Sequence, residues 1–387
     1  MIPYARQNIN SNDIRSVVKV LKSDFLTTGP MVPKFEAKLA KKVKANHGVA
    51  VNSATSALHI ACLALGLKKN DYLWTVPLSF VASANCGLYC GAKIEFVDIE
   101  KNFPNIDVNE LEKKLIKSKK KKTLPKILVV VDFCGHSCDM KKISELSKIY
   151  RFKVIEDASH ALGGTYMSNP VGSCKYSDIT VFSFHPIKMI TTAEGGMALT
   201  NNKTLYEKLI LLRSHGITRN SKFFKNKKKH QQKWYYEQLD LGFNYRMNDI
   251  QAALGLSQLN RLNFFVKKRN YIAKFYNKNL KDLPISLPKV RKNTLSSFHL
   301  YIIQINKKIK KGRDEVFKGL LKLGIGVNVH YIPIHLQPFF KSKGFKLGQF
   351  KNSENFFKQS ITIPLHCGLT NFQLNRIIYS IKKCLKN

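Results

Sequence analysis

The chain has 387 residues and a hydrophobic share of 44%, which is enough for two or three domains and a sizeable buried core. No window holds the roughly 20 apolar residues of a membrane helix, and no apolar segment follows Met1-Ile-Pro-Tyr-Ala-Arg-Gln7 as it would in a signal peptide. The eight cysteines lack paired regular spacing and fit reduced thiols. We therefore expect a soluble, cytoplasmic protein.

The formal net charge of +40 raises the alternative of a nucleic-acid binder, which would bind with a steep salt dependence. Lysine dominates the excess, and its densest run, residues 117–122, contains no aromatic side chain that would stack on bases. We interpret this run as a solvated connection between a helix and a strand, and we expect no nucleic-acid partner. A diffuse positive field would still attract an anionic small substrate.

Helical and strand patterns alternate through the first half of the chain. Apolar residues at helical spacing predict helices over residues 11–23, 35–43, 57–65, 140–150 and 203–215. β-Branched and aromatic runs predict strands over residues 48–51, 72–77, 92–97, 127–132, 153–157, 180–184 and 197–200. The alternation between residues 48 and 200 implies an α/β fold whose mostly parallel sheet is covered by helices on both faces.

The pattern changes in the second half of the chain. In order, we expect a mobile basic loop over residues 218–236, a turn over 241–249 and one long helix over 250–276. After Pro284, short strands alternate with helices, which is typical of a smaller α+β domain. We place the strands at 299–305 and 325–330 and the helices at 313–323 and 353–359.

A run of small residues, Asn52 to Ser56, joins the first predicted strand of the sheet to an apolar helix. The free N–H groups at such a helix start, with the hydroxyls of Thr55 and Ser56, can bind an anion such as phosphate. An ordinary helix cap is the commoner use of the same pattern. The run therefore indicates a phosphate site without specifying a cofactor.

Three further residues lie at predicted strand ends. Phe80 stands at a strand–helix junction, Asp157 closes one strand, and Lys188 follows the strand that Pro186 ends. Ligands collect at the carboxyl ends of strands in open α/β sheets, where a lysine beside hydroxyls is a candidate Schiff-base residue. A core phenylalanine, a capping aspartate and a surface lysine are the alternatives for each residue taken alone.

Taken together, these residues meet the requirements of pyridoxal 5'-phosphate (PLP). That cofactor needs a lysine amine, a carboxylate that keeps its pyridine nitrogen protonated, a helix N-terminus for its phosphate and a ring that stacks on it. Cys134, His136 and Cys138 look like metal ligands, but no second ligand pair follows at a structural-zinc spacing. We therefore expect PLP and no metal.

Six motifs, spread over nearly the whole chain, resemble those of one known family. They are Asn52-Ser-Ala-Thr-Ser-Ala-Leu58, Glu156-Asp-Ala-Ser-His160, Phe182-Ser-Phe-His-Pro-Ile-Lys188, Thr192-Ala-Glu-Gly-Gly196, Asn244-Tyr-Arg-Met-Asn-Asp249 and His330-Tyr-Ile-Pro-Ile-His335. The chain resembles the nucleotide-sugar aminotransferases of the DegT/DnrJ/EryC1/StrS group, which have the fold-type-I PLP aminotransferase architecture. The resemblance implies a large PLP-binding domain with a seven-stranded sheet over residues 1–245. It also implies a long linking helix and a small C-terminal α+β domain over residues 246–387.

The resemblance also implies roles for individual residues. It makes Lys188 the catalytic lysine, and it assigns cofactor contacts to Ala54, Thr55, Phe80, Asp157, His160, Ser183, Lys188 and Asn244. Asn244 matches a phosphate contact that the second subunit donates, so a homodimer with shared active sites is implied. Many members have glycine where this chain has Ala54, which keeps the N–H group but needs a slightly different backbone. The resemblance assigns substrate contacts to Tyr4, Thr28, Gly29, His185, Tyr245, Arg246, His330 and Tyr331.

Residues 190–196 and 244–259 are most similar to the branch of this family that acts in pseudaminic acid synthesis. That branch aminates C4 of a UDP-linked 4-keto-6-deoxy-N-acetylhexosamine, and L-glutamate is the expected amino donor. The same segments also resemble relatives that use other UDP- or dTDP-linked ketosugars. Related dehydratases carry histidine in place of the lysine, so Lys188 favours transamination. A non-catalytic PLP-binding regulator is the alternative from another functional class.

Overall fold

The computed structural model describes residues 1–226, 232–306 and 311–386. Its centre is a seven-stranded sheet in the order β1-β9-β8-β5-β4-β2-β3. The strands are β1 (His47–Val51), β2 (Tyr72–Thr75), β3 (Lys93–Phe96), β4 (Ile127–Val131), β5 (Lys153–Asp157), β8 (Ile179–Ser183) and β9 (Gly196–Thr200). All run parallel except β9, which is antiparallel to both β1 and β8. The predicted mostly parallel seven-stranded sheet is confirmed.

Helices pack against both faces of this sheet. One face is covered by α3 (Ala54–Ala64), α4 (Ala82–Tyr89) and α7 (Lys203–Arg213). The other face is covered by α2 (Met31–Val43), α5 (Val108–Lys121), α6 (Met140–Tyr150) and α8 (Asp249–Leu259). Alternate residues of one strand therefore enter different cores: Val129 packs with the α3 side, and Leu128 packs with the α6 side. This double coverage explains why the strands read as continuous apolar runs.

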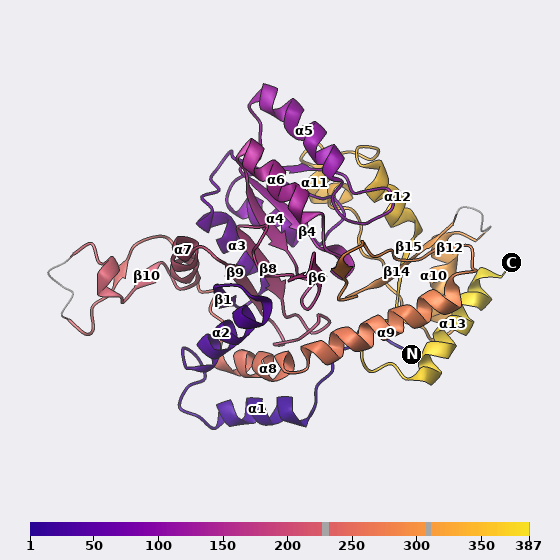
Figure 1. Cartoon of the computed structure of the whole chain (residues 1–387), viewed down its shortest axis with the longest axis horizontal. Coiled ribbons are helices and arrows are strands. Elements are labelled where there is room, and N and C mark those ends of the chain that lie inside the picture. The colour runs from indigo at the N-terminus through magenta and orange to yellow at the C-terminus, as the bar shows by residue number, and fades with distance from the viewer. Residues whose placement is uncertain (227–231, 307–310, 387) are drawn as a thin grey trace.

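The C-terminal elements build a second core. Their strands are β12 (Ile285–Ser286), β14 (Tyr301–Ile305) and β15 (Ser360–Ile363), and their helices are α10 (Arg313–Lys322), α11 (Pro338–Lys341), α12 (Lys351–Gln359) and α13 (Asn371–Leu385). Figure 1 shows α9 (Leu262–Leu280) leading from α8 beside the large sheet to α10 and α13. The second core is formed by α9, β14, β15, α10 and α13. The boundary between residues 245 and 246 stays a prediction.

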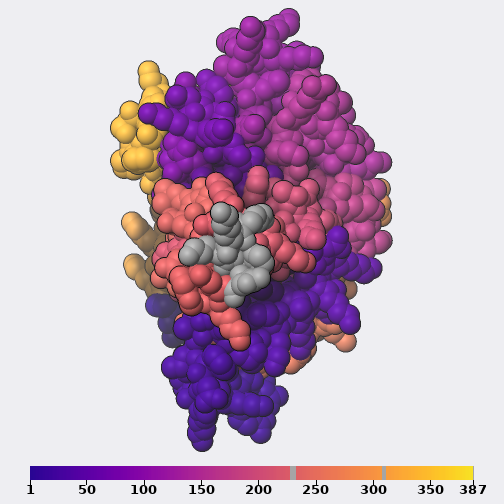
Figure 2. Space-filling model, turned by 90° about the vertical axis from the view of Figure 1, so that its left-hand side faces the viewer, coloured from indigo at the N-terminus to yellow at the C-terminus, as the bar shows by residue number. Residues whose placement is uncertain are grey.

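The remaining described elements are short, apart from the N-terminal helix α1 (Ser11–Leu21). The paired strands are β6 (Thr165–Tyr166), β7 (Asn169–Pro170) and β13 (Thr294–Leu295) in one sheet, and β10 (Ile217–Thr218) and β11 (Glu237–Gln238) in another. Single 3-10 turns occur at Phe133–Gly135, Ser221–Phe223 and Ile334–Leu336. The segment around β10 projects beyond α7 in Figure 1 and faces the reader in Figure 2. The mobile loop predicted over 218–236 includes residues 227–231, which lie outside the described residues.

Three of the predicted elements are wrong. The lysine run over residues 117–122 is not a connection, because α5 continues through it to Lys121. Lysine is a good helix former, and its positive charge stabilises the C-terminal end of a helix. The long helix predicted over 250–276 is two helices that meet at Asn260 and Arg261, where Arg261 turns to bind the N-terminal segment. Residues 325–330 form no described strand, only single bridges at Ile325 and Asn328.

The N-terminal segment is fixed by a buried carboxylate. Asp13 on α1 is fully buried, and it accepts hydrogen bonds from Ser257 Oγ at 2.6 Å and Gln258 Nε2 at 2.7 Å. The guanidinium of Arg261 pairs with the same carboxylate. A buried charge with this many partners holds α1 against α8, so Asp13 fixes the path by which the N-terminal residues reach the rest of the molecule.

We expect Asp13→Ala to lower the free energy of unfolding by about 3 kcal/mol, because it removes the buried acceptor that Ser257, Gln258 and the partly buried guanidinium of Arg261 share. Urea unfolding followed by circular dichroism measures the change. Asp24→Ala is the control, because Asp24 is exposed on the same segment. A loss below about 1 kcal/mol for Asp13→Ala would contradict this account of how α1 is anchored.

Candidate active site

A cavity of about 470 Å³ lies at the carboxyl ends of the central parallel strands. Val131 of β4, Asp157 of β5 and Val181 of β8 are register partners, so these strands end at one edge of the sheet. The predicted site residues that line the cavity are Tyr4, Ala54, Thr55, Phe80, Asp157, His160, Ser183, His185, Lys188, His330 and Tyr331. Residues more than 300 positions apart in the sequence thus meet in one cavity.

The start of α3 forms a pocket for an anion. Ser53 caps the helix and accepts a hydrogen bond from the N–H of Ser56. Within the described part of the chain, the N–H groups of Ala54 and Thr55 have no hydrogen-bond partner. A Cβ on Gly196 would lie 2.5 Å from the nitrogen of Ala54, so only glycine lets β9 approach this helix start. This set of donors fits a phosphate group.

Asp157 is buried and oriented by serine side chains. Ser83 Oγ donates to its Oδ2 at 2.7 Å, and Ser159 Oγ donates to its Oδ1 at 2.6 Å. The N–H of Ser159 adds a longer bond of 3.2 Å to the same oxygen. Neither serine was predicted from the sequence, because serines are common in turns. Ser83 of α4 lies next to the end of β5 only in the folded chain. Both oxygens of the carboxylate are therefore held in place, as a group that would pair with a protonated pyridine nitrogen needs to be.

Lys188 follows β8 in a turn in which its N–H donates to the carbonyl oxygen of His185. Burial lowers the pKa of the Lys188 amine to about 8, and the opposite charge of Asp157 limits that decrease. The side chain therefore exchanges its proton near neutral pH, which a Schiff-base lysine and a proton carrier both need. β8 ends at Ser183, and Pro186 belongs to the turn after it that brings Lys188 to the cavity.

Aromatic and imidazole rings form another wall of the cavity. The Phe80 side chain is 58% exposed, although it lies only 6.0 Å from the ring of Tyr331, so its open face is available to a ligand. His160 Nδ1 accepts a hydrogen bond from the N–H of Cys134 at 3.3 Å. Burial lowers the pKa of His160 well below its usual range and that of His330 to about 3. Both imidazoles are therefore neutral at neutral pH.

The loop that contains Thr28 and Gly29 lies outside the cavity. The N–H of Gly29 donates to Asp249 Oδ2 at 2.8 Å, and that of Met31 donates to Asp249 Oδ1 at 2.7 Å. Asp249 is fully buried at the start of α8, so these two bonds hold the loop against α8, and none of its residues lines the cavity. Thr28 and Gly29 therefore make no contact with the cavity of their own chain.

The predicted motif around Asn244 also lies outside the cavity of its own chain. Tyr245 points inward, with its hydroxyl 3.1 Å from His59 Nδ1, and Arg246 donates to Ser214 Oγ at 3.0 Å. Asn244 is exposed, and no hydrogen bond from its side chain is seen within the described residues. The structure therefore separates these residues from Lys188 within one subunit.

Sequence reasoning missed several lining residues, among them Ser79, Ser83, Ser159, Glu194 and Asn328. The Glu194 signal was available, because this residue belongs to the glycine-rich turn after Lys188. Among the described residues, no group of three or more His, Cys, Asp or Glu side chains is placed to hold a metal ion. Within the same residues, no helix has the length and apolar character to cross a membrane.

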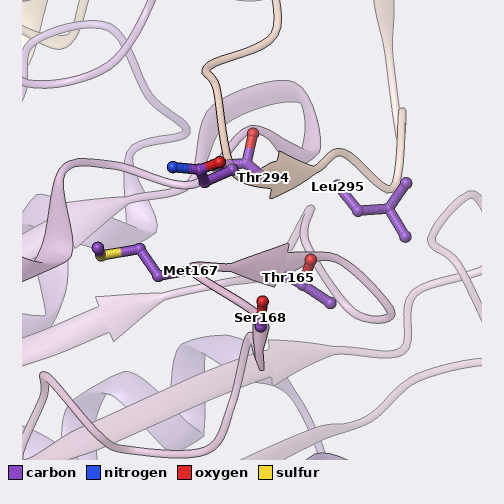
Figure 3. A pocket seen from close by; sticks show the side chains of 6 residues that line it. Thr165, Met167, Ser168, Thr294 and Leu295 are labelled. Atoms are coloured by element: carbon purple, nitrogen blue, oxygen red, sulfur yellow. The ribbon is translucent and has the colours of Figure 1, made fainter.

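A separate hollow of about 410 Å³ lies beside the paired strands β6 and β13. Its lining consists of Thr165, Met167, Ser168, Asn293, Thr294 and Leu295 (Figure 3). These side chains carry no charge and no group that titrates near neutral pH. This hollow therefore offers no acid or base for catalysis.

Three comparisons relate the chain to known proteins. Residues 7–382 match the model of the DegT/DnrJ/EryC1/StrS aminotransferase family. The chain is 43% identical to a UDP-4-amino-4,6-dideoxy-N-acetyl-beta-L-altrosamine transaminase of Campylobacter jejuni, over 95% of this chain and 93% of that protein.

Two solved structures are similar to this chain over 99% of its length and over 99% of their own length. One is Helicobacter pylori PseC, an aminotransferase of pseudoaminic acid biosynthesis, with a TM-score of 0.88 and 33% identity. The other is the PMP-form of the putative sugar aminotransferase Spr1654 from Streptococcus pneumoniae, with a TM-score of 0.89 and 28% identity. Spr1654 is also similar to this chain in its PLP-form. The predicted architecture and cofactor are confirmed.

We expect Lys188→Met to stabilise the protein freed of PLP, by about 2 kcal/mol at pH 7. The pKa of Lys188 is lowered on folding, so the unfolded chain binds more protons between pH 8 and 10.5. Below pH 8 the buried cation lowers the free energy of unfolding of the wild type by its full amount. This destabilisation disappears as the pH rises from 8 to 10.5, because the amine loses its proton. The advantage of Lys188→Met should therefore fall by roughly half at pH 9.5.

Denaturant unfolding of the two proteins at both pH values tests this expectation. Lys203→Met is the matched control, because Lys203 is exposed on α7 and its replacement should change stability little at either pH. If Lys188→Met is less stable than the wild type at pH 7, burial of the charged amine does not destabilise the protein, and the expectation is wrong.

Proposed function

Because the chain belongs to the DegT/DnrJ/EryC1/StrS aminotransferase family, we propose that it transfers an amino group from L-glutamate to C4 of a UDP-linked ketosugar. The substrate would be UDP-2-acetamido-2,6-dideoxy-beta-L-arabino-hex-4-ulose, for surface glycan synthesis. Membership establishes a PLP-dependent sugar aminotransferase. The observation that carries the choice of sugar is the 43% identity to a UDP-altrosamine transaminase over 95% of the chain.

The residues of the cavity can hold PLP in one orientation. Its phosphate would meet the N–H groups of Ala54 and Thr55, its pyridine nitrogen would meet Asp157, and its ring would lie against Phe80. When bound, the cofactor supplies an electron sink for the carbanion that forms next to the transferred nitrogen. Ser83, through its bond to Asp157, holds the carboxylate on the ring side of the cavity.

Lys188 is the proton carrier of this proposal. With a pKa of about 8, roughly a tenth of the Lys188 Nζ groups are unprotonated at pH 7, and that unprotonated amine can take the proton from the α-carbon of glutamate. The same amine, now charged, can deliver a proton, because burial makes the charged form costly. His160 and His330 are neutral and add no positive charge that would lower the pKa of Lys188 further.

We further propose a homodimer in which each subunit completes its partner's site. The support is the position of Asn244, an exposed residue outside the cavity of its own chain with no described partner for its side chain. Thr28 and Gly29 lie in a rigid loop that is likewise separate from the cavity. A cytoplasmic location is supported by the eight free cysteines, which fit a reducing compartment.

We expect Lys188→Ala to abolish turnover and the absorbance of the lysine-bound cofactor, because no other amine lines the cavity within the described residues. The substrate is tested with wild-type protein on a panel of UDP- and dTDP-linked 4-ketosugars, with amine formation as the readout. The UDP-linked N-acetylated sugar should be preferred by at least about tenfold in kcat/KM. Binding of PLP without any amine transfer from glutamate would instead identify a regulator.

Mixing two inactive variants tests whether the sites are shared. In the proposed dimer, each site contains Lys188 of one subunit and Asn244 of the other. A hybrid of a Lys188→Ala subunit and an Asn244→Ala subunit therefore has one site with both substitutions and one site with neither. Activity should therefore return to about a quarter of the wild-type value after random mixing, because half the dimers are hybrids and each has one intact site. Absence of recovery in verified hybrids would place Asn244 in the site of its own chain.

A further inference from the structure

His330 turns one ring nitrogen toward the cavity and uses the other to contact a strand behind it. Its Nδ1 lies 2.8 Å from Thr362 Oγ1, and both side chains are buried. Among the described residues its Nε2 has no hydrogen-bond partner, yet it is not sealed from solvent as the unpartnered buried nitrogens are. Because His330 lines the cavity, this second nitrogen is the one that a bound ligand can reach.

Thr362 is itself fixed by its backbone. It lies in β15, where it pairs with Ile302 of β14. On its other side, its N–H donates to the carbonyl oxygen of Asn328 at 2.8 Å, and its own carbonyl oxygen accepts the N–H of Asn328 at 3.1 Å. Asn328 also lines the cavity, two residues before His330, whereas Thr362 does not line it. One strand residue outside the cavity therefore holds the segment that carries two of its lining side chains.

The direction of the bond between Thr362 and His330 follows from the hydroxyl group. Among the described residues, the Thr362 hydroxyl has no other hydrogen-bond partner. If Nδ1 carried the proton and donated it, the hydroxyl hydrogen would be buried without an acceptor, which is unfavourable. The hydroxyl therefore donates to Nδ1. Burial lowers the pKa of His330 to about 3, so the neutral ring carries its single proton on Nε2.

Two tyrosine rings fix the plane of the imidazole. The ring of Tyr331 lies at 84° to that of His330, with 4.8 Å between the centroids, and the ring of Tyr4 lies 5.6 Å away. Tyr4 is held in turn by its carbonyl oxygen, which accepts the N–H of Leu365 at 3.0 Å. Within the described residues, neither tyrosine forms a hydrogen bond with an imidazole nitrogen. The tyrosines therefore orient the ring, and Thr362 determines which nitrogen carries the proton.

A neutral N–H donor of this kind suits an uncharged oxygen. Glutamate presents charged carboxylates at neutral pH, and a cation binds these more strongly than a neutral donor does. The ketosugar of the proposed function presents two carbonyl oxygens, one at C4 and one in its N-acetyl group. A carbonyl oxygen only accepts hydrogen bonds, so the other tautomer of the ring would place a lone pair against it. A sugar hydroxyl, in contrast, would tolerate either tautomer.

We propose that Thr362 is a positioning residue that keeps the proton of His330 on Nε2, and that this N–H binds a carbonyl oxygen of the sugar substrate. The identity of the sugar rests on the proposed function, whereas the tautomer does not. Replacement of a residue outside the cavity should therefore weaken one contact inside it, without removing any group that touches the substrate.

Nitrogen NMR of the full protein, loaded with PLP and labelled in its histidine rings, tests the tautomer without any substrate. His330→Gln identifies the His330 signals by their disappearance. We expect a protonated Nε2 and an unprotonated Nδ1 between about pH 6 and pH 8. In Thr362→Val the Nδ1 signal should move to the position of a nitrogen without a donor, whereas Thr362→Ser should keep the wild-type position. A protonated Nδ1 in the wild type would overturn the role of Thr362.

The sugar contact is tested in single turnovers, followed by the absorbance of the cofactor, with glutamate and with the ketosugar separately. Thr362→Val should slow the reaction with the UDP-linked N-acetylated ketosugar about tenfold and that with glutamate less than about twofold. Thr362→Ser should restore most of the sugar rate. Thr200→Val is the matched control, because the buried hydroxyl of Thr200 donates to the carbonyl oxygen of Asp178 at 2.8 Å, away from the cavity. Equal losses with glutamate and sugar would refute the sugar contact.

A ketosugar with a hydroxyl group in place of the N-acetyl group separates the two carbonyl oxygens. If the effect of Thr362→Val persists with this sugar, His330 binds the ketone oxygen; if it disappears, His330 binds the N-acetyl oxygen. A wild-type protein that aminates no UDP-linked ketosugar would contradict both the proposed function and the sugar contact. The nitrogen spectra would still decide whether Thr362 sets the tautomer, so the two failures are distinguishable.

Discussion

Everything in this molecule depends on holding the amine of Lys188 in a cavity that disfavours its charge. Burial lowers the pKa of that amine, and the carboxylate of Asp157 limits the decrease, so the amine stays able to gain and lose a proton near neutral pH. The two residues meet because β5 and β8 are parallel neighbours that end at the same edge of the sheet. A parallel sheet buried on both faces is what places the two groups side by side and keeps bulk water from screening them.

Much of this arrangement follows from the sequence. The apolar runs identified the central strands, and the order of Thr55, Asp157 and Lys188 along the chain was enough to place a phosphate pocket, an acid and an amine at one edge. Such positions are predictable because they depend on strand ends, and strand ends are marked by local signals such as Pro186. Family resemblance then assigned chemistry to residues whose individual signals were weak, such as Phe80 and His160.

The parts that escaped prediction depend on contacts between distant segments. Ser83 acts on Asp157 only because α4 packs against the end of β5, and no local pattern distinguishes it from other turn serines. The break between α8 and α9 occurs where Arg261 reaches back to Asn8 and Asp13, so its cause lies almost 250 residues earlier in the chain. Helical periodicity alone continues through that break. Side-chain partners of this kind become visible only once the fold is known.

The run Asn244 to Arg246 shows how one motif can serve two surfaces. Its backbone is extended, with bridges from Asn244 to Ser214 and from Arg246 to Val51, so successive side chains point to opposite sides. Asn244 therefore faces outward, while Tyr245 faces inward and places its hydroxyl 3.1 Å from His59 Nδ1. The carbonyl oxygen of Tyr245 accepts the N–H of Asn52, directly before the helix start that would hold the phosphate. A displacement of this run would act on the cofactor pocket and on the outward-facing Asn244 at once, because a single stretch of backbone connects the two.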